Sequence, residues 1–123
     1  MNVKVYKDSR LIAENIHVAK SFLTRLVGLL GKKTLEPGEG LLLMPCRQIH
    51  TWFMSIDIDV VFLDTNGQIM ASIAGMKPGL ASPRVKNCCR VLEMAAGSIA
   101  RHDLLIGTVL EIRESNLLQR FTI

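Results

Sequence analysis

The sequence predicts a β-rich α+β domain, with a mostly antiparallel curled sheet or a partly closed small barrel and one main helix. Three observations lead to this fold class. Short runs of β-branched and aromatic residues alternate with turn signals along most of the chain. One segment, at about residues 22–30, has apolar residues at clear helical spacing. Hairpin spacings favour antiparallel pairing, and a sheet of about seven strands tends to curl so that its edges are protected.

The size and composition indicate one globular domain. A chain of 123 residues forms a single domain, here residues 1–123, and can bury one core. The hydrophobic fraction of 49% and the charged fraction of 21% are typical of globular proteins. The net charge of +4 gives weak attraction to polyanions without identifying a partner. We find no apolar run of membrane-spanning length and no signal-peptide pattern, so we expect a cytoplasmic protein.

The first third of the chain predicts a hairpin and then the helix. Valine and isoleucine alternate with polar residues over 3–18, and Lys7-Asp8-Ser9 supplies turn chemistry between the two strands. Ser21 is a good N-cap for the helix over 22–30, and Gly31 is a good residue to end it.

The middle of the chain predicts three strands. Residues 41–44 are a short apolar strand that ends at Pro45. Residues 58–63 are β-branched and aromatic and indicate a buried strand. Asn66-Gly67 is a strong hairpin signal, and residues 68–74 form the return strand.

The last third predicts a loop, a strand, a helical turn and a final strand. Residues 75–83 are rich in Gly and Pro and form a loop, a type of segment that often borders functional sites. A strand is expected at 88–94, a helical turn at 97–102 and the last strand at 108–112. The tail, 114–123, has weak signals of order.

Residues 46–64 are the most informative stretch, because they place a thiol, an imidazole, the only tryptophan, a thioether and two carboxylates beside one apolar strand. On a regular strand, alternate residues from His50 onward share one face, and an indole there suits a flat or sugar-like ligand. We therefore predict a small-ligand-binding domain with a pocket formed by His50, Thr51, Trp52, Met54 and Asp59. The alternative, in which the two rings are ordinary core residues, stays open.

An enzyme is the first alternative function. A hydrolase or metal-dependent enzyme could use His50 with Asp57, Asp59 or Cys46, because these groups can transfer protons, attack a substrate or bind a metal. No oxyanion loop or orienting third residue is visible. The Cys46–His50 spacing needs further ligands before it forms a zinc site. We expect no metal and no cofactor, and the sequence leaves open whether the protein is an enzyme.

A weak nucleic-acid or protein interaction module is the second alternative. Aromatic residues make up only 5% of the chain, so stacking platforms for bases are scarce, and nucleic-acid binding is not favoured. A small molecule is the expected partner, and the oligomeric state is not predicted. The three cysteines, Cys46, Cys88 and Cys89, are an odd number and are expected to be reduced thiols.

Two carboxylates lie inside apolar runs and are expected to be buried. Asp59 and Glu93 both have apolar neighbours, and a buried carboxylate needs hydrogen-bond donors or a countercharge. We predict Arg25, on the helix, as the partner of one of them. Such a link makes Arg25 and Glu93 structural rather than catalytic.

Five blocks of the chain resemble one known family. The hallmark is Ile49-His50-Thr51-Trp52-Phe53-Met54, and the apolar strand follows it directly. The other matching blocks are residues 25–30, 40–43, 91–97 and 106–108. Through these blocks the chain resembles the bacterial and archaeal family known as domain of unknown function 192, over about residues 20–112. The resemblance implies a small β-rich domain in a bacterium, and it implies no reaction.

One detail departs from the family pattern. The commoner ordering in the family has Pro before Ile-Asp or Leu-Asp at the entry to the strand, whereas residues 55–59 here, Ser-Ile-Asp-Ile-Asp, contain no Pro. The resemblance places the family's carboxylate at Asp59 and puts Asp57 where the Pro usually stands.

Overall fold

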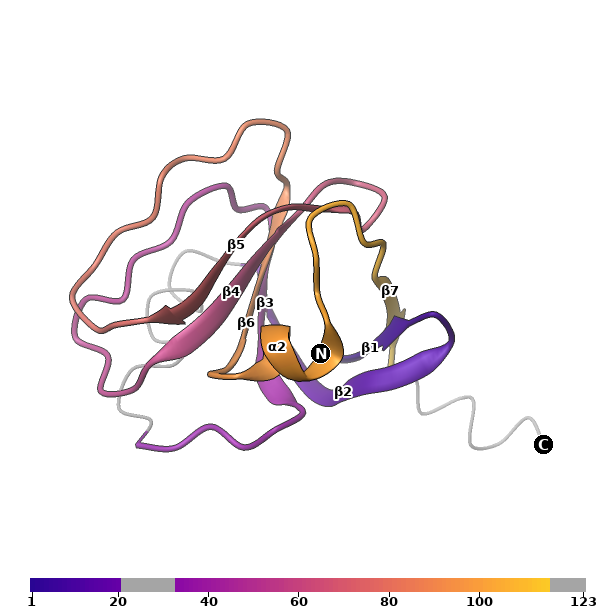
Figure 1. Cartoon of the computed structure of the whole chain (residues 1–123), viewed down its shortest axis with the longest axis horizontal. Helices are drawn as coiled ribbons and strands as arrows, with labels where there is room; N and C mark the ends of the chain where they lie inside the picture. Colours follow the sequence, from indigo (N-terminus) through magenta and orange to yellow (C-terminus); the bar gives the residue numbers. More distant parts are fainter. Residues whose placement is uncertain (21–32, 116–123) are drawn as a thin grey trace.

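The computed structural model describes residues 1–20 and 33–115, and Figure 1 draws the remainder in grey. The predicted helix over 22–30, with Arg25, lies outside the described residues, and so does nearly all of the tail over 114–123. The described residues form one sheet and one short helix, which confirms the predicted β-rich α+β class.

Seven strands make up the sheet in the described part of the chain, in the order β5-β4-β6-β3-β2-β1-β7. Five of the six strand pairings are antiparallel and the β2–β3 pairing is parallel, so the sheet is mixed and mostly antiparallel. The bounds are Asn2–Lys7 for β1, Arg10–Ala19 for β2, Glu39–Leu43 for β3, Ile58–Leu63 for β4, Ile69–Met76 for β5, Arg90–Ala95 for β6, Ser98–His102 for α2 and Glu111–Glu114 for β7.

The sheet curls without closing into a full barrel. The first residues of edge strand β5 bind the chain just before β7, the other edge strand. The Ile69 N–H donates to the Thr108 carbonyl, and the Leu110 N–H donates to the Gly67 carbonyl, each at 2.8 Å. The predicted final strand over 108–112 is therefore displaced. Its first residues form backbone hydrogen bonds with the start of β5, and β7 begins only at Glu111.

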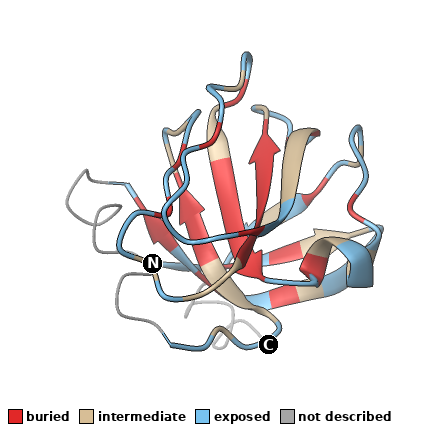
Figure 2. Ribbon diagram, turned by 60° about the vertical axis from the view of Figure 1, so that its left-hand side comes forward, coloured by how far each residue is buried: buried red, intermediate tan, exposed pale blue. Residues whose placement is uncertain are grey.

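Two apolar layers lie on the two faces of the sheet, and the central strands contribute to both. All six residues of β4 are buried, because β4 alternates between the layers and both layers cover it. Val61 and Leu63 belong to one cluster, whereas Val60 and Phe62 belong to the other. Figure 2 shows the buried residues concentrated on the central strands. A continuous hydrophobic run, rather than an alternating one, is the expected sequence for such a strand.

Gly67 provides a test of the contact between the start of β5 and the chain just before β7. Its φ of +81° is left-handed, and a Cβ added there would lie 2.2 Å from the Leu110 carbonyl oxygen. Gly79 has nearly the same φ, +82°, with open space around it. We expect Gly67→Ala to lower the free energy of unfolding by about 2 kcal/mol more than Gly79→Ala, because only the first adds a backbone clash. Urea denaturation checks this, and equal losses would contradict the steric explanation.

Candidate functional site

Two long connections project together from the sheet and form what we call the arm. The arm consists of residues 44–57, between β3 and β4, and residues 77–89, between β5 and β6. Both connections lie on the same side of the sheet in Figure 1. Backbone hydrogen bonds join them at successive points: Val85 N–H to Arg47 carbonyl at 2.9 Å, and Ser82 N–H to Ile49 carbonyl at 2.8 Å. The two connections therefore support each other away from the sheet.

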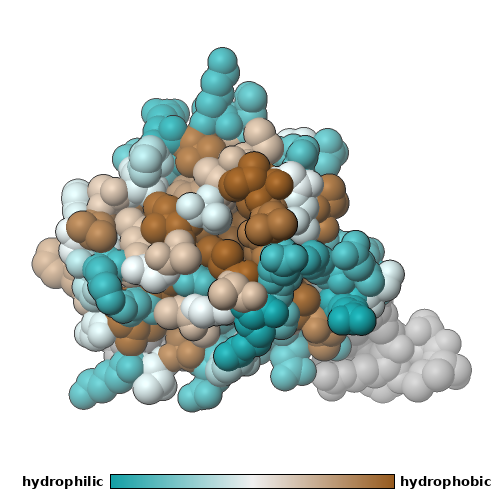
Figure 3. All heavy atoms as spheres, viewed as in Figure 1, coloured by the Kyte–Doolittle hydropathy of each residue, from teal (hydrophilic) through white to brown (hydrophobic). Residues whose placement is uncertain are grey.

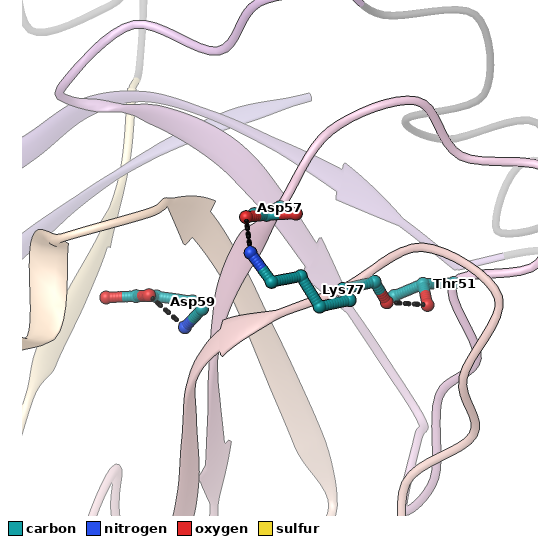
Figure 4. Close-up of polar contacts among 5 residues, drawn as sticks. Thr51, Asp57, Asp59 and Lys77 are labelled. Carbon is teal, nitrogen blue, oxygen red and sulfur yellow. Dashed lines mark hydrogen bonds and ion pairs between the residues drawn. The ribbon is translucent and has the colours of Figure 1, made fainter.

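Thr51 is the main anchor of the arm and is fully buried. Its hydroxyl donates to the Lys77 carbonyl at 2.6 Å and accepts from the Leu80 N–H at 3.0 Å. Its own N–H donates to the Leu80 carbonyl at 2.8 Å, and its carbonyl accepts from Gly79 at 2.9 Å. Figure 4 shows the side chain pointing toward the backbone of the opposite connection. Thr51 was predicted to line a ligand pocket, and these contacts favour a positioning role instead.

The residues beside Thr51 face solvent and form what we call the tip: His50, Trp52, Phe53 and Leu80. The His50 and Trp52 rings stack, with centroids 4.4 Å apart and an interplanar angle of 21°. Phe53 is 87% exposed at a left-handed φ of +65°, and Leu80 lies across from Thr51. Residues 49–54, whose conformation the sequence left open, are thus an isolated bridge at His50 followed by a turn. Two predicted site residues, His50 and Trp52, lie together.

The other predicted site residues face inward. Met54 is half-buried and packs against the second apolar cluster. Asp59, which is only 1% exposed, accepts three backbone hydrogen bonds: from Gly75 at 2.8 Å, from Gly97 at 3.1 Å and from Ile99 at 2.8 Å. The carboxylate thus joins β4 to an irregular part of β5 and to the start of α2. These contacts favour a role in the scaffold.

Asp57 lies outside this buried network. It forms an ion pair with Lys77 across the base of the arm (Figure 4), and the side chains of Lys77 and Asp57 are 70% and 37% exposed. The two aspartates therefore do not act as a pair on one face of a strand. This outcome agrees with a solvated Asp57 at the start of the strand.

The groups needed for the enzyme alternative do not converge in the described residues. In residues 1–20 and 33–115, the His50 side chain has a ring partner, Trp52, and no hydrogen bond to a carboxylate or thiol. The Cys46 thiol donates to the Gln48 carbonyl at 3.2 Å. Burial raises the pKa of the Cys88 thiol, which makes it a poorer nucleophile. The same residues contain no group of three or more His, Cys, Asp or Glu that could hold a metal.

Glu93 is buried in β6, between Leu41 of β3 and Val60 of β4. Loss of hydration raises its pKa from an ordinary 4.5 to about 7. The predicted ion pair with Arg25 lies outside the described residues. Burial is the physical cause of this rise in the Glu93 pKa.

Sequence reasoning did not place Phe53 or the second half of the arm in the site. On a regular strand Phe53 would lie on the opposite face from Trp52, and the turn at these residues removes that alternation. Leu80 carried one signal, since it is a large apolar residue inside a loop rich in Gly and Pro. Its partner Thr51 is distant in sequence and could not be identified from spacing.

Comparisons with known proteins agree with this fold. The family model for domain of unknown function 192 (DUF192), described as "Uncharacterized ACR", matches residues 3–112. The chain belongs to this family, whose function is unknown. No curated protein matches the sequence. None of the helices in residues 1–20 and 33–115 is long and apolar enough to cross a membrane.

Two crystal structures share the fold at 21% sequence identity. A protein of unknown function from Novosphingobium aromaticivorans aligns with a TM-score of 0.78 over 90% of this chain and 84% of that one. A protein described as a candidate transcription regulator from Sinorhizobium meliloti aligns with a TM-score of 0.73 over 89% and 91%. At this identity the likeness shows a common fold.

The role of Asp59 can be tested with an isosteric variant. We expect Asp59→Asn to lower the free energy of unfolding by about 3 kcal/mol, because an amide can accept from fewer of the three N–H groups and brings a donor against them. Urea denaturation measures the loss. The control is Asp57→Asn, which breaks an exposed ion pair and should cost no more than about 1 kcal/mol. Similar losses in both variants would show that Asp59 is not an internal anchor.

The raised pKa of Glu93 predicts a pH-dependent stability. Between about pH 4.5 and pH 7 the unfolded chain loses the Glu93 proton before the folded protein does. Stability from this group therefore falls as pH rises through that window, by about 3 kcal/mol in total, and is constant above it. Urea denaturation across the window should show this slope in the native protein and lose it in Glu93→Gln. The exposed Glu14→Gln control should keep the slope.

Proposed function

We propose that this domain is a binding module whose contact surface is the tip of the arm. The observation that carries the proposal is Phe53. An aromatic residue at φ +65° is disfavoured by about 1–2 kcal/mol, and with 87% of its surface exposed the side chain gains little from burial. Strain that persists without a packing gain suggests that the ring serves an interaction outside the chain.

The stacked pair beside Phe53 supports the same proposal. His50 and Trp52 are exposed, so their stack offers flat surface to a ligand and does not contribute to the core. The indole also supplies an N–H donor beside its apolar surface, a combination that is common at binding interfaces. For a small ligand, we propose a flat molecule that covers the His50 and Trp52 rings.

The way in which Thr51 holds the tip also supports the proposed binding role. Each hydrogen bond of Thr51 holds the turn at residues 52–53 against the second connection, so the tip is held before a partner arrives. Ordering a flexible loop on binding would reduce affinity, and a preformed loop avoids that loss. In this proposal Thr51 and Asp59 position the surface, and Met54 fixes it to the core.

A cytoplasmic location in a bacterium is part of the proposal. All three cysteines are in the thiol form, which suits a reducing compartment. The two similar crystal structures are of bacterial proteins.

The backbone strain at Phe53 can be tested without a ligand. Phe53→Asn keeps a residue that tolerates a left-handed φ and removes the ring. We expect it to raise the free energy of unfolding by about 1 kcal/mol, measured by urea denaturation, because relief of strain exceeds the small loss of burial. The control is Leu105→Asn, at a side chain that is 61% exposed elsewhere, which should leave stability within about 0.5 kcal/mol. A destabilised Phe53→Asn would show that the ring serves the fold.

Binding itself is tested with a thermal-shift screen of soluble nucleotides, sugars and aromatic metabolites, followed by fluorescence of Trp52, the only tryptophan. A ligand of the tip should change the emission and lose affinity in His50→Ala and Phe53→Asn. A ligand whose thermal shift is the same in both variants binds elsewhere, and would contradict the proposed site.

A further inference from the structure

We propose that the partner of the tip is the surface of an anionic lipid bilayer. In this arrangement the aromatic and aliphatic side chains of the tip insert at the level of the lipid headgroups, and the cations of the arm lie above them. The inference rests on the proposed function, since it requires the tip to be a contact surface. It adds the chemical class of the partner.

The composition of the tip is the first argument. Trp52 and Phe53 follow each other in one turn, and hydrogen bonds between Thr51 and Leu80 place a third exposed apolar residue, Leu80, opposite the residue that precedes them. Tryptophan is enriched where a bilayer meets water, because its ring is apolar and its N–H is polar. Phenylalanine and leucine supply the apolar part of known interfacial segments.

The shape of the tip is the second argument. Small-molecule sites are concave and bury most of their ligand, whereas Phe53 is 87% exposed and Trp52 is 50% exposed. A convex apolar group is covered most completely by a soft partner that closes around it, as lipid headgroups do. Single-stranded nucleic acid is bound along charged grooves in which rings form platforms, and a projecting phenyl ring does not match that geometry.

The charge of the arm is the third argument. Four cationic residues lie on the two connections, all of them exposed: Arg47, Lys77, Arg84 and Lys86. Asp57 is the only acidic residue there, so the arm holds three of the four net positive charges of the whole chain. Cations close to an anionic leaflet increase binding severalfold each, and the effect falls with salt.

Exposed apolar residues alone do not define such a surface. Figure 3 shows hydrophobic side chains in several separate patches among hydrophilic ones, which is usual for a protein surface. Leu105, Ile106 and Val109 are exposed to a similar degree on the connection between α2 and β7. No residue from 104 to 110 is cationic, although the preceding Asp103 has a left-handed φ of +54° and its carbonyl accepts from the Lys7 ammonium at 2.9 Å. Within residues 1–20 and 33–115, the tip differs from this patch in carrying two exposed aromatic rings on an arm with four cations. The second patch therefore serves as an internal control.

The experiment uses the full chain with two kinds of vesicle, one of phosphatidylcholine and one of phosphatidylcholine mixed with phosphatidylglycerol. Co-sedimentation and the emission of Trp52 are measured at low and high salt. We expect the protein to sediment with the anionic vesicles, with a blue shift of the Trp52 emission, and to be released by high salt. Phe53→Asn and the double variant Arg84→Glu/Lys86→Glu should each weaken binding at least tenfold. Leu105→Asn should bind like the native protein.

Several results would overturn the inference. Absence of sedimentation and of a blue shift with anionic vesicles removes the bilayer as partner, and so does binding that Phe53→Asn leaves unchanged. If a single-stranded oligonucleotide alters the Trp52 emission and vesicles do not, the partner is a nucleic acid. If a soluble metabolite acts at the tip and vesicles do not, the lipid inference fails while the proposed function stands. If no partner depends on Phe53 or His50, both fail.

Discussion

A carboxylate buried in an interior strand of the sheet must accept hydrogen bonds from donors inside the protein, and much of the structure depends on how these donors are supplied. Asp59 lies in β4, which has no side open to water, and its partners are three backbone N–H groups. To supply them, β5 becomes irregular near Gly75, and α2 begins beside β4. One side chain therefore sets the geometry of two neighbouring elements.

In the arm, a buried hydroxyl group binds backbone groups as the Asp59 carboxylate does in the sheet. Thr51 is buried where no regular ladder passes, and its hydroxyl and backbone satisfy the polar groups of the opposite connection. Both residues belong to the stretch that contains the family hallmark. Much of that stretch therefore serves to hold a loop in place, while the exposed rings next to Thr51 are the part that is free to meet a partner.

The sequence predicted the strands and hairpins better than the long connections. Strand β4, the first hairpin and the turn after Asn66 follow local patterns, and so they were recognisable from single segments. The parallel β2–β3 pairing was not predicted, because hairpin spacings were the main signal of strand pairing. The His50 and Trp52 rings would share a face on a regular strand, and they stack although the segment forms a turn. Their actual turn depends on Leu80, which is brought to Thr51 only by the completed sheet.

The two halves of the arm come from connections that the whole β4–β5 hairpin separates in the chain. During synthesis the aromatic turn therefore emerges from the ribosome well before the backbone groups that hold it. Until β5 and β6 have joined the sheet, Thr51 lacks its partners and the neighbouring rings have no defined orientation. A chain that stops short of this stage lacks the finished tip, so the proposed binding through the tip requires a domain that has finished folding.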